Sequence, residues 1–226
     1  MRTIEYRFAL QRSATVLAVA AFSLVILAGV TGILLSFYYE PTAGGAFTSL
    51  RRITEMIPSG VLIRSLHDLA GNGLIVIALL QIVVMFLGRQ FRPSWIAAWI
   101  SGIFYALVAI GLSWTAIILD WDQVGYWRYK VELKTIEIIP LIGSYLRDIL
   151  TGGNGVNSIT VQHMYTLHSY VLSGVAIVLS VIHLGALIYQ EQERRQVRTR
   201  LNTVVSRAAG LSVTEEEASE QAEASV

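Results

Sequence analysis

Four long apolar runs divide the chain, and each is long enough to cross a membrane. They cover residues 15–39, 66–88, 95–119 and 165–189. About 20 apolar residues in a helix span a hydrocarbon core about 30 Å thick, and a helix satisfies its own backbone polar groups in lipid. The pattern therefore predicts an all-α, polytopic membrane protein whose four spans form a helix bundle within one domain, residues 1–205.

The polar segments between the spans indicate their orientation. The tight link at residues 88–93 carries two arginines and no acid, and further arginines precede the first span and follow the last. Positive charge accumulates on the cytoplasmic side of a membrane protein. Because the number of spans is even, both termini are expected on the cytoplasmic side.

The third connection, residues 120–164, is too long to be a structureless loop in a compact bundle. In residues 131–150 of this connection, apolar and charged residues alternate with the period of a helix, and Pro140 interrupts the pattern. This predicts one or two short surface helices on the membrane face. Residues 206–226 are rich in Glu, Ala and Ser without an apolar period, which predicts a disordered acidic tail.

Composition then limits the available chemistry. Of the 226 residues 54% are hydrophobic and 15% charged, against roughly 25% charged in soluble domains. The absence of cysteine excludes disulfides, thiolate metal sites, iron–sulfur ligation and thioether-linked cofactors. The net charge of +1 comes without a basic stripe, so no nucleic-acid partner is expected. Histidine, methionine, carboxylates and aromatic rings remain.

Two histidines lie at matching depth inside different spans. His67 is near the outer end of the second span and His168 near the outer end of the fourth. Ionisable side chains inside a membrane are costly and mark functional sites, and imidazoles from facing helices can hold a haem iron from both sides. We therefore expect a bis-histidine haem b with His67 and His168 as iron ligands. The alternative is a pair of structural, hydrogen-bonded histidines.

A third histidine, His183, follows His168 by fifteen residues on the same span, or about 22 Å of helix. A second haem at this depth needs a partner about fourteen residues after His67, and that position is Gln81. A glutamine amide is a poor iron ligand. Two interpretations stay open: His183 holds a second haem iron alone, or it is a hydrogen-bonded bundle residue.

Two further residues flank the outer histidine pair. Arg64, one turn before His67, can reach water or pair with an anionic cofactor group. His163 lies at the membrane edge, in Gln162-His163-Met164-Tyr165. We interpret His163 as an interfacial or cofactor-edge residue rather than an iron ligand.

Several strings along the chain resemble a known family. They are Phe37-Tyr38-Tyr39-Glu40-Pro41-Thr42, Leu62-Ile63-Arg64-Ser65-Leu66-His67, Trp121-Asp122-Gln123-Val124-Gly125-Tyr126-Trp127 and Ile139-Pro140-Leu141-Ile142-Gly143. Their order and spacing resemble cytochrome b, in the short four-helix form of cytochrome bf complexes, which corresponds to the N-terminal half of cytochrome bc-type cytochrome b. The resemblance covers about residues 31–188.

The resemblance implies roles for individual residues. His67 and His168 would hold the outer haem b, and Arg64 would neutralise one of its propionates. Small residues on the first and third spans would let the haem faces approach the backbone: Ala18, Gly32, Gly102 and Ala116. The string from Trp121 would form part of a quinol site with Trp121, Asp122, Gln123, Gly125, Tyr126 and Trp127.

The resemblance also implies a setting. The chain would be the haem b electron-transfer subunit of a Rieske/cytochrome b-type quinol oxidoreductase, a dimeric complex in a bacterial-type inner, energy-transducing membrane. Its partners would be a Rieske iron–sulfur protein, a separate subunit supplying the C-terminal half of cytochrome b, a cytochrome c and membrane lipid. Two rival readings are a haem-bearing anchor subunit of another respiratory or photosynthetic complex without its own quinol turnover, and a helical scaffold with structural histidines.

Four positions depart from the pattern of this family. Gln81 stands in place of the inner haem's histidine, and Val84 in place of the arginine for that haem's propionate. Asp120 replaces a proline before the Trp-Asp-Gln string, and His163 replaces an arginine near the outer haem. The first two predict an altered or missing inner haem.

Overall fold

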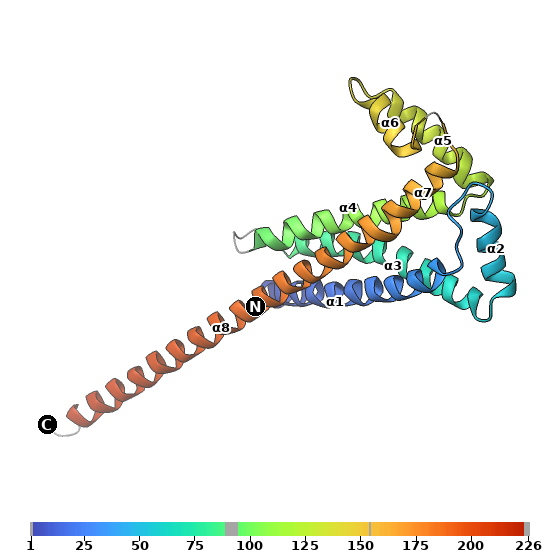
Figure 1. The fold of residues 1–226 in the computed structure, drawn as a ribbon. Helices are drawn as coiled ribbons and strands as arrows, with labels where there is room; N and C mark the ends of the chain where they lie inside the picture. The colour runs from blue at the N-terminus through green and yellow to red at the C-terminus, as the bar shows by residue number, and fades with distance from the viewer. Residues whose placement is uncertain (1, 89–94, 154, 224–226) are drawn as a thin grey trace.

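The computed structural model describes residues 2–88, 95–153 and 155–223, and every regular element in these ranges is helical. The elements, in chain order, are α1 (Arg2–Ser36), α2 (Ala46–Met56), α3 (Gly60–Leu87), α4 (Ile96–Leu119), α5 (Gln123–Glu137), α6 (Gly143–Thr151), α7 (Ser158–Thr166), the π-helical segment η2 (Leu167–Leu172) and α8 (Ser173–Glu223). Figure 1 shows α1, α3, α4 and the α7–η2–α8 rod running along one another as a bundle.

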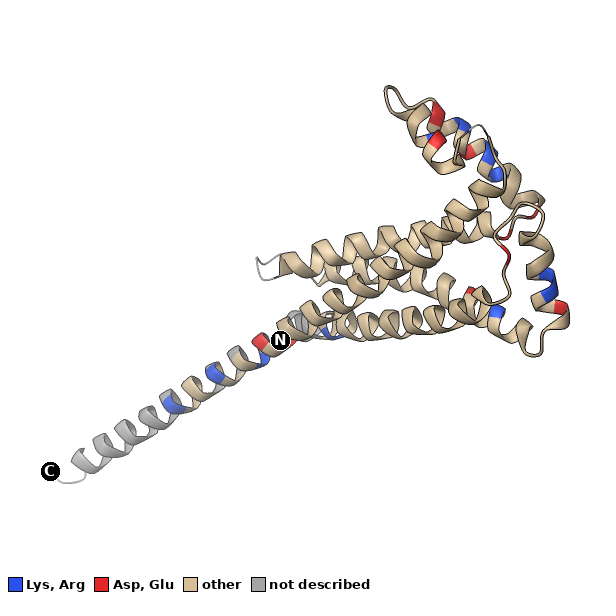
Figure 2. Cartoon of the chain, in the orientation of Figure 1, with Lys and Arg blue, Asp and Glu red and all other residues tan. Residues whose placement is uncertain are grey.

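The four predicted spans are confirmed as helices long and apolar enough to cross a membrane. They are Ala9–Ser36, Gly60–Leu87, Ile96–Leu119 and Ser158–Glu193. Many of their large apolar side chains face outward, which in water would be costly but in lipid is the expected arrangement. The chain is therefore a multi-pass membrane protein. Figure 2 shows the same division, because charged residues gather beyond the ends of the bundle.

We call the end of the bundle that carries α2, α5 and α6 the outer end, following the predicted orientation, and the opposite end the inner end. The link 89–94, on which that orientation partly depends, lies outside the described residues. Arginines that flank the spans therefore support the orientation from the sequence alone.

Three buried apolar clusters follow one another along the bundle. The outer cluster contains Ala46, Ile118, Leu119, Tyr129, Leu133, Val161 and Met164. The middle cluster contains Ala21, Val25, Leu74, Ala78, Tyr105, Ala106 and Ala109. The inner cluster contains Ala14, Ala18, Met85, Trp95, Ala98 and Leu187. Alanine is frequent in the middle and inner clusters, and small side chains let membrane helices approach closely. The histidines fall between these clusters.

The connections at the outer end are helical. Helices α5 and α6, separated around Pro140, confirm short helices in the third connection, where one or two were predicted. Helix α2 forms in the first connection, among the helix-breaking residues Pro41, Gly44, Gly45 and Pro58. These breakers lie outside α2 and bound it, while its buried residues Ala46, Ser49 and Ile53 give it an apolar face against the bundle.

The C-terminal tail differs from the expectation. The structure continues α8 as a helix through residues 206–223, where the composition predicts disorder. Alanine and glutamate are strong helix formers, and adding residues to an existing helix avoids the cost of nucleation. In Figure 1 this part of α8 extends well beyond the other helices.

Candidate functional site

His67 from α3 and His168 from η2 face each other near the outer end of the bundle. The centroids of their rings are 6.2 Å apart and the ring planes differ by 58°. Both side chains are partly buried. The matched depth inferred from the sequence is therefore reproduced by the structure, and the two rings form one layer of the bundle, which we call the outer layer.

Hydrogen bonds fix the tautomer of His67. Its Nδ1 lies 3.0 Å from the carbonyl oxygen of Ala28 and 3.1 Å from Oγ1 of Thr31. Because a carbonyl oxygen can only accept, Nδ1 must carry the hydrogen. The Thr31 hydroxyl gives its own hydrogen to the carbonyl of Leu27, at 2.7 Å. The Nε2 of His67 therefore keeps its lone pair.

His168 is held in the same way from α4. Its Nδ1 lies 2.8 Å from Oγ1 of Thr115, and the Thr115 hydroxyl donates to the carbonyl of Gly111 at 2.9 Å. The threonine oxygen therefore accepts the Nδ1 hydrogen of His168. Each ring of the outer layer thus has an anchored Nδ1–H and an Nε2 lone pair, which is the form of histidine that binds metals.

The local backbone around His168 is unusual. In η2 the chain makes a wide π-helical turn, in which the backbone N–H of Ser173 bonds to the carbonyl of His168, five residues earlier. Single π-turns inside α-helices occur frequently at functional sites. A period of 3.6 residues, applied to the whole fourth span, does not reveal this turn.

The outer layer fits a bis-imidazole iron site. A metal–nitrogen bond of about 2 Å on each side, together with half the width of each ring, accounts for the 6.2 Å between the centroids. The backbone of α1 passes close by, since a Cβ placed on Gly32 would lie 3.1 Å from Cε1 of His67. The glycine is therefore explained by the proximity of the histidine ring.

A second polar layer, the inner layer, consists of Gln81, Ser101 and His183, all of which are buried. Gln81 lies opposite His183, as the spacing predicts, with 2.5 Å between Nε2 of the amide and Nε2 of the imidazole. On the other edge of the ring, Nδ1 of His183 lies 2.9 Å from Oγ of Ser101. Tyr105 stacks on the histidine at a centroid distance of 6.3 Å.

The hydrogen bonds of the inner layer occupy both nitrogens of His183. The Ser101 hydroxyl donates to the carbonyl of Ala97 at 2.7 Å, so its oxygen accepts the Nδ1 hydrogen of His183. The lone pair on Nε2 then accepts a hydrogen from the Gln81 amide, which also donates to the carbonyl of Ala14 at 3.3 Å. Oε1 of Gln81 has no partner among the described residues.

The inner layer therefore does not fit a bis-histidine haem. Its one imidazole already accepts a hydrogen bond at the nitrogen that would face iron, and the opposing side chain is an amide in direct contact. Gly102 belongs to this layer, because a Cβ there would lie 2.9 Å from Cε1 of His183. Ala18 is buried in the inner cluster, and Ala116 follows Thr115 on α4.

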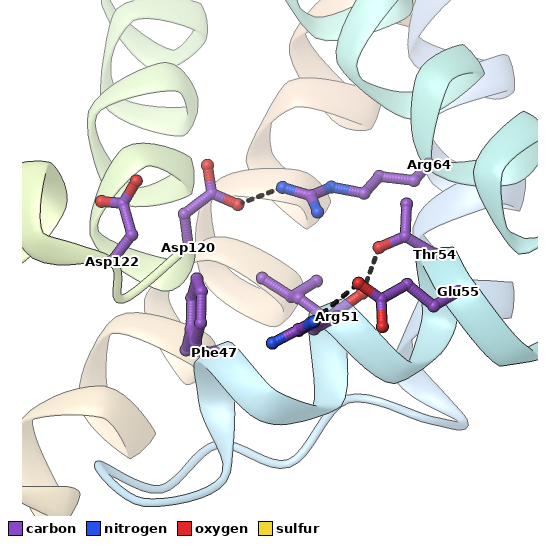
Figure 3. Close-up of a pocket in the computed structure, with 8 residues that line it drawn as sticks. Phe47, Arg51, Thr54, Glu55, Arg64, Asp120 and Asp122 are labelled. Atoms are coloured by element: carbon purple, nitrogen blue, oxygen red, sulfur yellow. Dashed lines mark hydrogen bonds and ion pairs between the residues drawn. The ribbon is translucent and has the colours of Figure 1, made fainter.

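Arg64 lies in the first turns of α3 and points across to α4 (Figure 3). Its Nη2 donates to Oδ1 of Asp120 at 2.9 Å, and its Nε lies 3.9 Å from Oδ2 of Asp68. The sequence suggested water or an anionic cofactor group as the partner of Arg64, whereas in the structure Arg64 pairs with the carboxylate of Asp120. Asp120 was noticed only as a departure from proline, because its distance to Arg64 depends on how α3 and α4 pack.

The Arg64–Asp120 pair lines a cavity of about 350 Å³ at the outer end (Figure 3). Its walls are Phe47, Leu50, Arg51, Thr54, Glu55, Arg64, Asp120 and Asp122. Partial burial raises the pKa of Asp120 above its ordinary value, and the carboxylates of Asp68 and Asp122 raise it further, while Arg64 opposes the shift. The cavity thus combines apolar and charged residues of α2 with Arg64 of α3 and with the two aspartates that follow α4.

Residues of the predicted quinol segment stabilise the start of α5 and its close approach to α4. Asp122 caps α5, since its Oδ1 accepts from the backbone N–H of Gly125 at 2.7 Å, and such caps stabilise helix starts. A Cβ on Gly125 would lie 2.4 Å from the carbonyl oxygen of Ile117, so only glycine fits there. Trp121 has a positive φ of 48°, which is rare and strained for a bulky residue.

The remaining residues of this segment form a surface cluster. Nε1 of Trp127 donates to Oε1 of Gln123 at 3.0 Å, and the rings of Tyr126 and Trp127 meet edge to face at 5.3 Å. The Lys130 ammonium lies over both rings, at 5.4 Å and 5.3 Å. Within this segment Asp122 lines the 350 Å³ cavity, whereas Trp127 is exposed.

His163 is turned toward α6. Its Nδ1 lies 3.1 Å from the carbonyl oxygen of Ile149, and its ring passes close to Gly152, where a Cβ would lie 3.0 Å from Cε1. The side chain is exposed. This placement agrees with an interfacial histidine and gives His163 a role in fastening α7 to α6.

Comparison with known proteins gives a consistent result. The family model described as Cytochrome b/b6/petB matches residues 10–191. Cytochrome b6 of Cyanidium caldarium is 34% identical over 153 residues, which cover 68% of this chain and 71% of the relative. Cytochrome b6 of Mastigocladus laminosus is 33% identical over 153 residues, with the same shares covered.

Among solved structures, a chain of a hyperthermophilic respiratory Complex III matches with a TM-score of 0.63 and 26% identity. The match covers 78% of this chain and 47% of the solved one, so this chain spans about half the length of that structural relative. Taken with the four apolar helices and the facing histidines, the matches show that the chain belongs to the cytochrome b/b6/petB family.

Proposed function

We propose that this protein is the haem b electron-transfer subunit of a Rieske/cytochrome b-type quinol oxidoreductase, and that it holds a single bis-histidine haem at its outer layer. The observation that carries the proposal is the pair of imidazoles facing each other with 6.2 Å between centroids and with both Nδ1 atoms already hydrogen-bonded. Membership in the cytochrome b/b6/petB family supports it.

In this function His67 and His168 hold the haem, which supplies one-electron transfer when bound. Ala28, Thr31 and Thr115 keep the two rings oriented and their Nε2 lone pairs available. Gly32 leaves room for the ring of His67 beside α1. Apolar clusters on both sides of the layer keep water and lipid away from the iron ligands.

The inner layer serves a different purpose in this proposal. Gln81 and Ser101 satisfy both nitrogens of His183, so they connect α3, α4 and α8 at the depth where a second haem would otherwise join helices. Electrons then have one haem site in this chain, near the outer end. They would enter from a quinol near residues 121–127 and leave to a carrier on the same side of the membrane.

The partners follow from that role. A Rieske iron–sulfur protein would take one electron of the quinol, a separate subunit would supply the second half of the quinol site, and a cytochrome c would accept electrons in a dimeric assembly. Co-purification of a Rieske protein with the chain tests this part. A haem-containing preparation without a Rieske protein or quinol oxidation would instead fit an anchor subunit of another complex.

The haem count tests the central claim. We expect a pyridine haemochrome assay of the purified protein to give one haem b per polypeptide, and a low-temperature EPR spectrum of the oxidised protein to contain one low-spin signal. Two haems per chain, or a high-spin signal of equal amount, would show that the inner layer binds haem. A preparation without a Soret band would contradict the proposal altogether.

Thr115→Val tests the anchoring of His168. The change removes the acceptor for the Nδ1 hydrogen of His168 at nearly constant volume, and the loss of such supporting bonds typically lowers metal affinity by about ten- to a hundred-fold. We expect faster loss of haem to a haem-scavenging protein, followed by absorbance. Ser101→Ala is the matched control, because it removes the equivalent bond to His183. Equal effects of the two changes would refute the assignment.

A further inference from the structure

The ion pair between Arg64 and Asp120 lies next to the outer layer from two sides. Arg64 is three residues before His67 on α3, about 4.5 Å along the helix axis, and residues so spaced are neighbours on one face. Asp120 is five residues after Thr115, about 7.5 Å along the axis of α4, and Thr115 bonds to His168. The Arg64–Asp120 pair is thus connected to His67 through α3, and to His168 through Thr115 of α4.

The charges around this pair are predominantly negative. Arg64 contacts Asp120 and Asp68, and Asp122 lines the same cavity, so three carboxylates accompany one guanidinium. Arg51 and Glu55 on α2 neutralise each other at 2.8 Å. From the segment after α1, the Tyr39 hydroxyl donates to the carbonyl of Leu119, beside Asp120, and the pKa of that hydroxyl is raised, chiefly by burial. The titratable and charged groups facing Asp120 are therefore Tyr39, Arg51, Glu55, Arg64, Asp68 and Asp122.

Protons can reach Asp120 from the aqueous side. Its side chain is 48% exposed while it bonds to Arg64, and it opens on the 350 Å³ cavity between α2, α3 and α4, as Figure 3 shows. Partial burial and the neighbouring carboxylates raise the pKa of this carboxyl above the ordinary value of an aspartate. Asp120 therefore combines access to protons with proximity to the haem site.

An electron placed at the outer layer adds a negative charge beside a group of carboxylates. In a partly buried setting such charges interact more strongly than in water, and a nearby negative charge favours the protonated form of a carboxyl group. Of the three carboxylates, Asp120 makes the short contact to Arg64 and ends the helix that anchors His168. It is the carboxylate best placed to respond.

We propose that Asp120 takes up a proton when the outer haem is reduced, and that this couples the haem's midpoint potential to pH. The inference rests on the proposed function. One electron, supplied by quinol, converts ferric to ferrous haem, and one proton from the outer aqueous phase converts the Asp120 carboxylate to the carboxylic acid. Because protonation removes a negative charge beside the haem, the potential is higher at low pH and falls as pH rises.

The test is a redox titration of the purified protein with dithionite and ferricyanide, followed in the haem absorbance bands and repeated from about pH 5 to about pH 9. In the wild type we expect the midpoint potential to fall with rising pH. In Asp120→Asn, which keeps the shape of the side chain, it should be higher than in the wild type at neutral pH and depend less on pH. Glu55→Gln removes a carboxylate from the same cavity that is already paired with Arg51, and it should behave as the wild type.

Each result decides between the alternatives. A wild-type potential that does not change with pH would overturn the inference without any variant, and so would an Asp120→Asn protein with an unchanged pH profile. An equal effect of Glu55→Gln would show that the general charge of the cavity, not Asp120, is responsible. Protein that binds no haem would overturn the proposed function as well, so the two failures are distinguishable.

Discussion

We expect a His168→Ala variant to lose the low-spin haem spectrum that the proposed function assigns to the protein. Alanine removes the Nε2 lone pair that faces His67 across the outer layer, and the bundle offers no other imidazole at that depth. Iron bound by His67 alone would have an open position and become high-spin. We expect the haem content per polypeptide to fall by about ten-fold or more, because even the loss of a residue that only supports a metal ligand typically lowers metal affinity by about ten- to a hundred-fold. Optical and EPR spectra of the oxidised protein measure both effects.

The control for this variant is His163→Ala. His163 lies five residues earlier, is exposed and bonds to the carbonyl of Ile149, so its loss should leave the spectrum unchanged. His67→Ala should match His168→Ala, since the two rings are equivalent in the outer layer. An unchanged low-spin signal in either variant of the pair would show that the iron ligands are misassigned.

We expect a Gln81→His variant to bind two haems per polypeptide, where the proposed function gives the wild type one. The new imidazole would face His183 at the inner layer, where Gln81 now occupies the Nε2 atom of that histidine. The residues around it are small, because Gly102 lies against His183 and the buried Ala98 and Ala18 belong to the inner cluster. We expect a second low-spin EPR signal together with a doubled pyridine haemochrome value.

A Gln81→Leu variant tests whether a second haem requires a new ligand or only the removal of the Gln81 amide. Leucine removes the hydrogen bond to His183 without supplying a ligand, so the haem count should stay at one. It would also leave Nε2 of His183 without its partner, and a buried unsatisfied group costs about 1–3 kcal/mol. A count of one in both variants would mean that the inner layer is closed to haem for reasons beyond residue 81.

The parts of the fold that could be predicted are those in which one sequence pattern is kept over many residues. Four apolar runs determine four spans, because lipid imposes the same requirement on every residue of a span. Counting fourteen residues from His67 and fifteen from His168 correctly paired Gln81 with His183, and the wide turn of η2, which lies within the second interval, accounts for the difference of one residue.

The parts that could not be predicted depend on packing or on a local change of period. Helix α2 was not predicted, because it lies between prolines and glycines that break helices. In the structure these residues bound the helix. The pairing of Arg64 with Asp120 joins residues 56 positions apart, and no local pattern encodes that distance. Asp122 and Gly125 look like quinol-site residues in the resemblance, yet their contacts explain them as a helix cap and a close backbone approach.

The wide turn at Leu167–Leu172 has a consequence for how such a chain can change by insertion and deletion. His168 and His183 are fifteen residues apart, whereas His67 and Gln81, which face them, are fourteen apart. A π-turn accommodates one more residue than an α-turn, so the fourth span holds the extra residue as a local widening and both of its histidines still face α3. Deleting one residue inside the turn would therefore restore a regular α-helix with both histidines in place, whereas a deletion between them that left the turn intact would rotate one histidine by about 100° relative to the other.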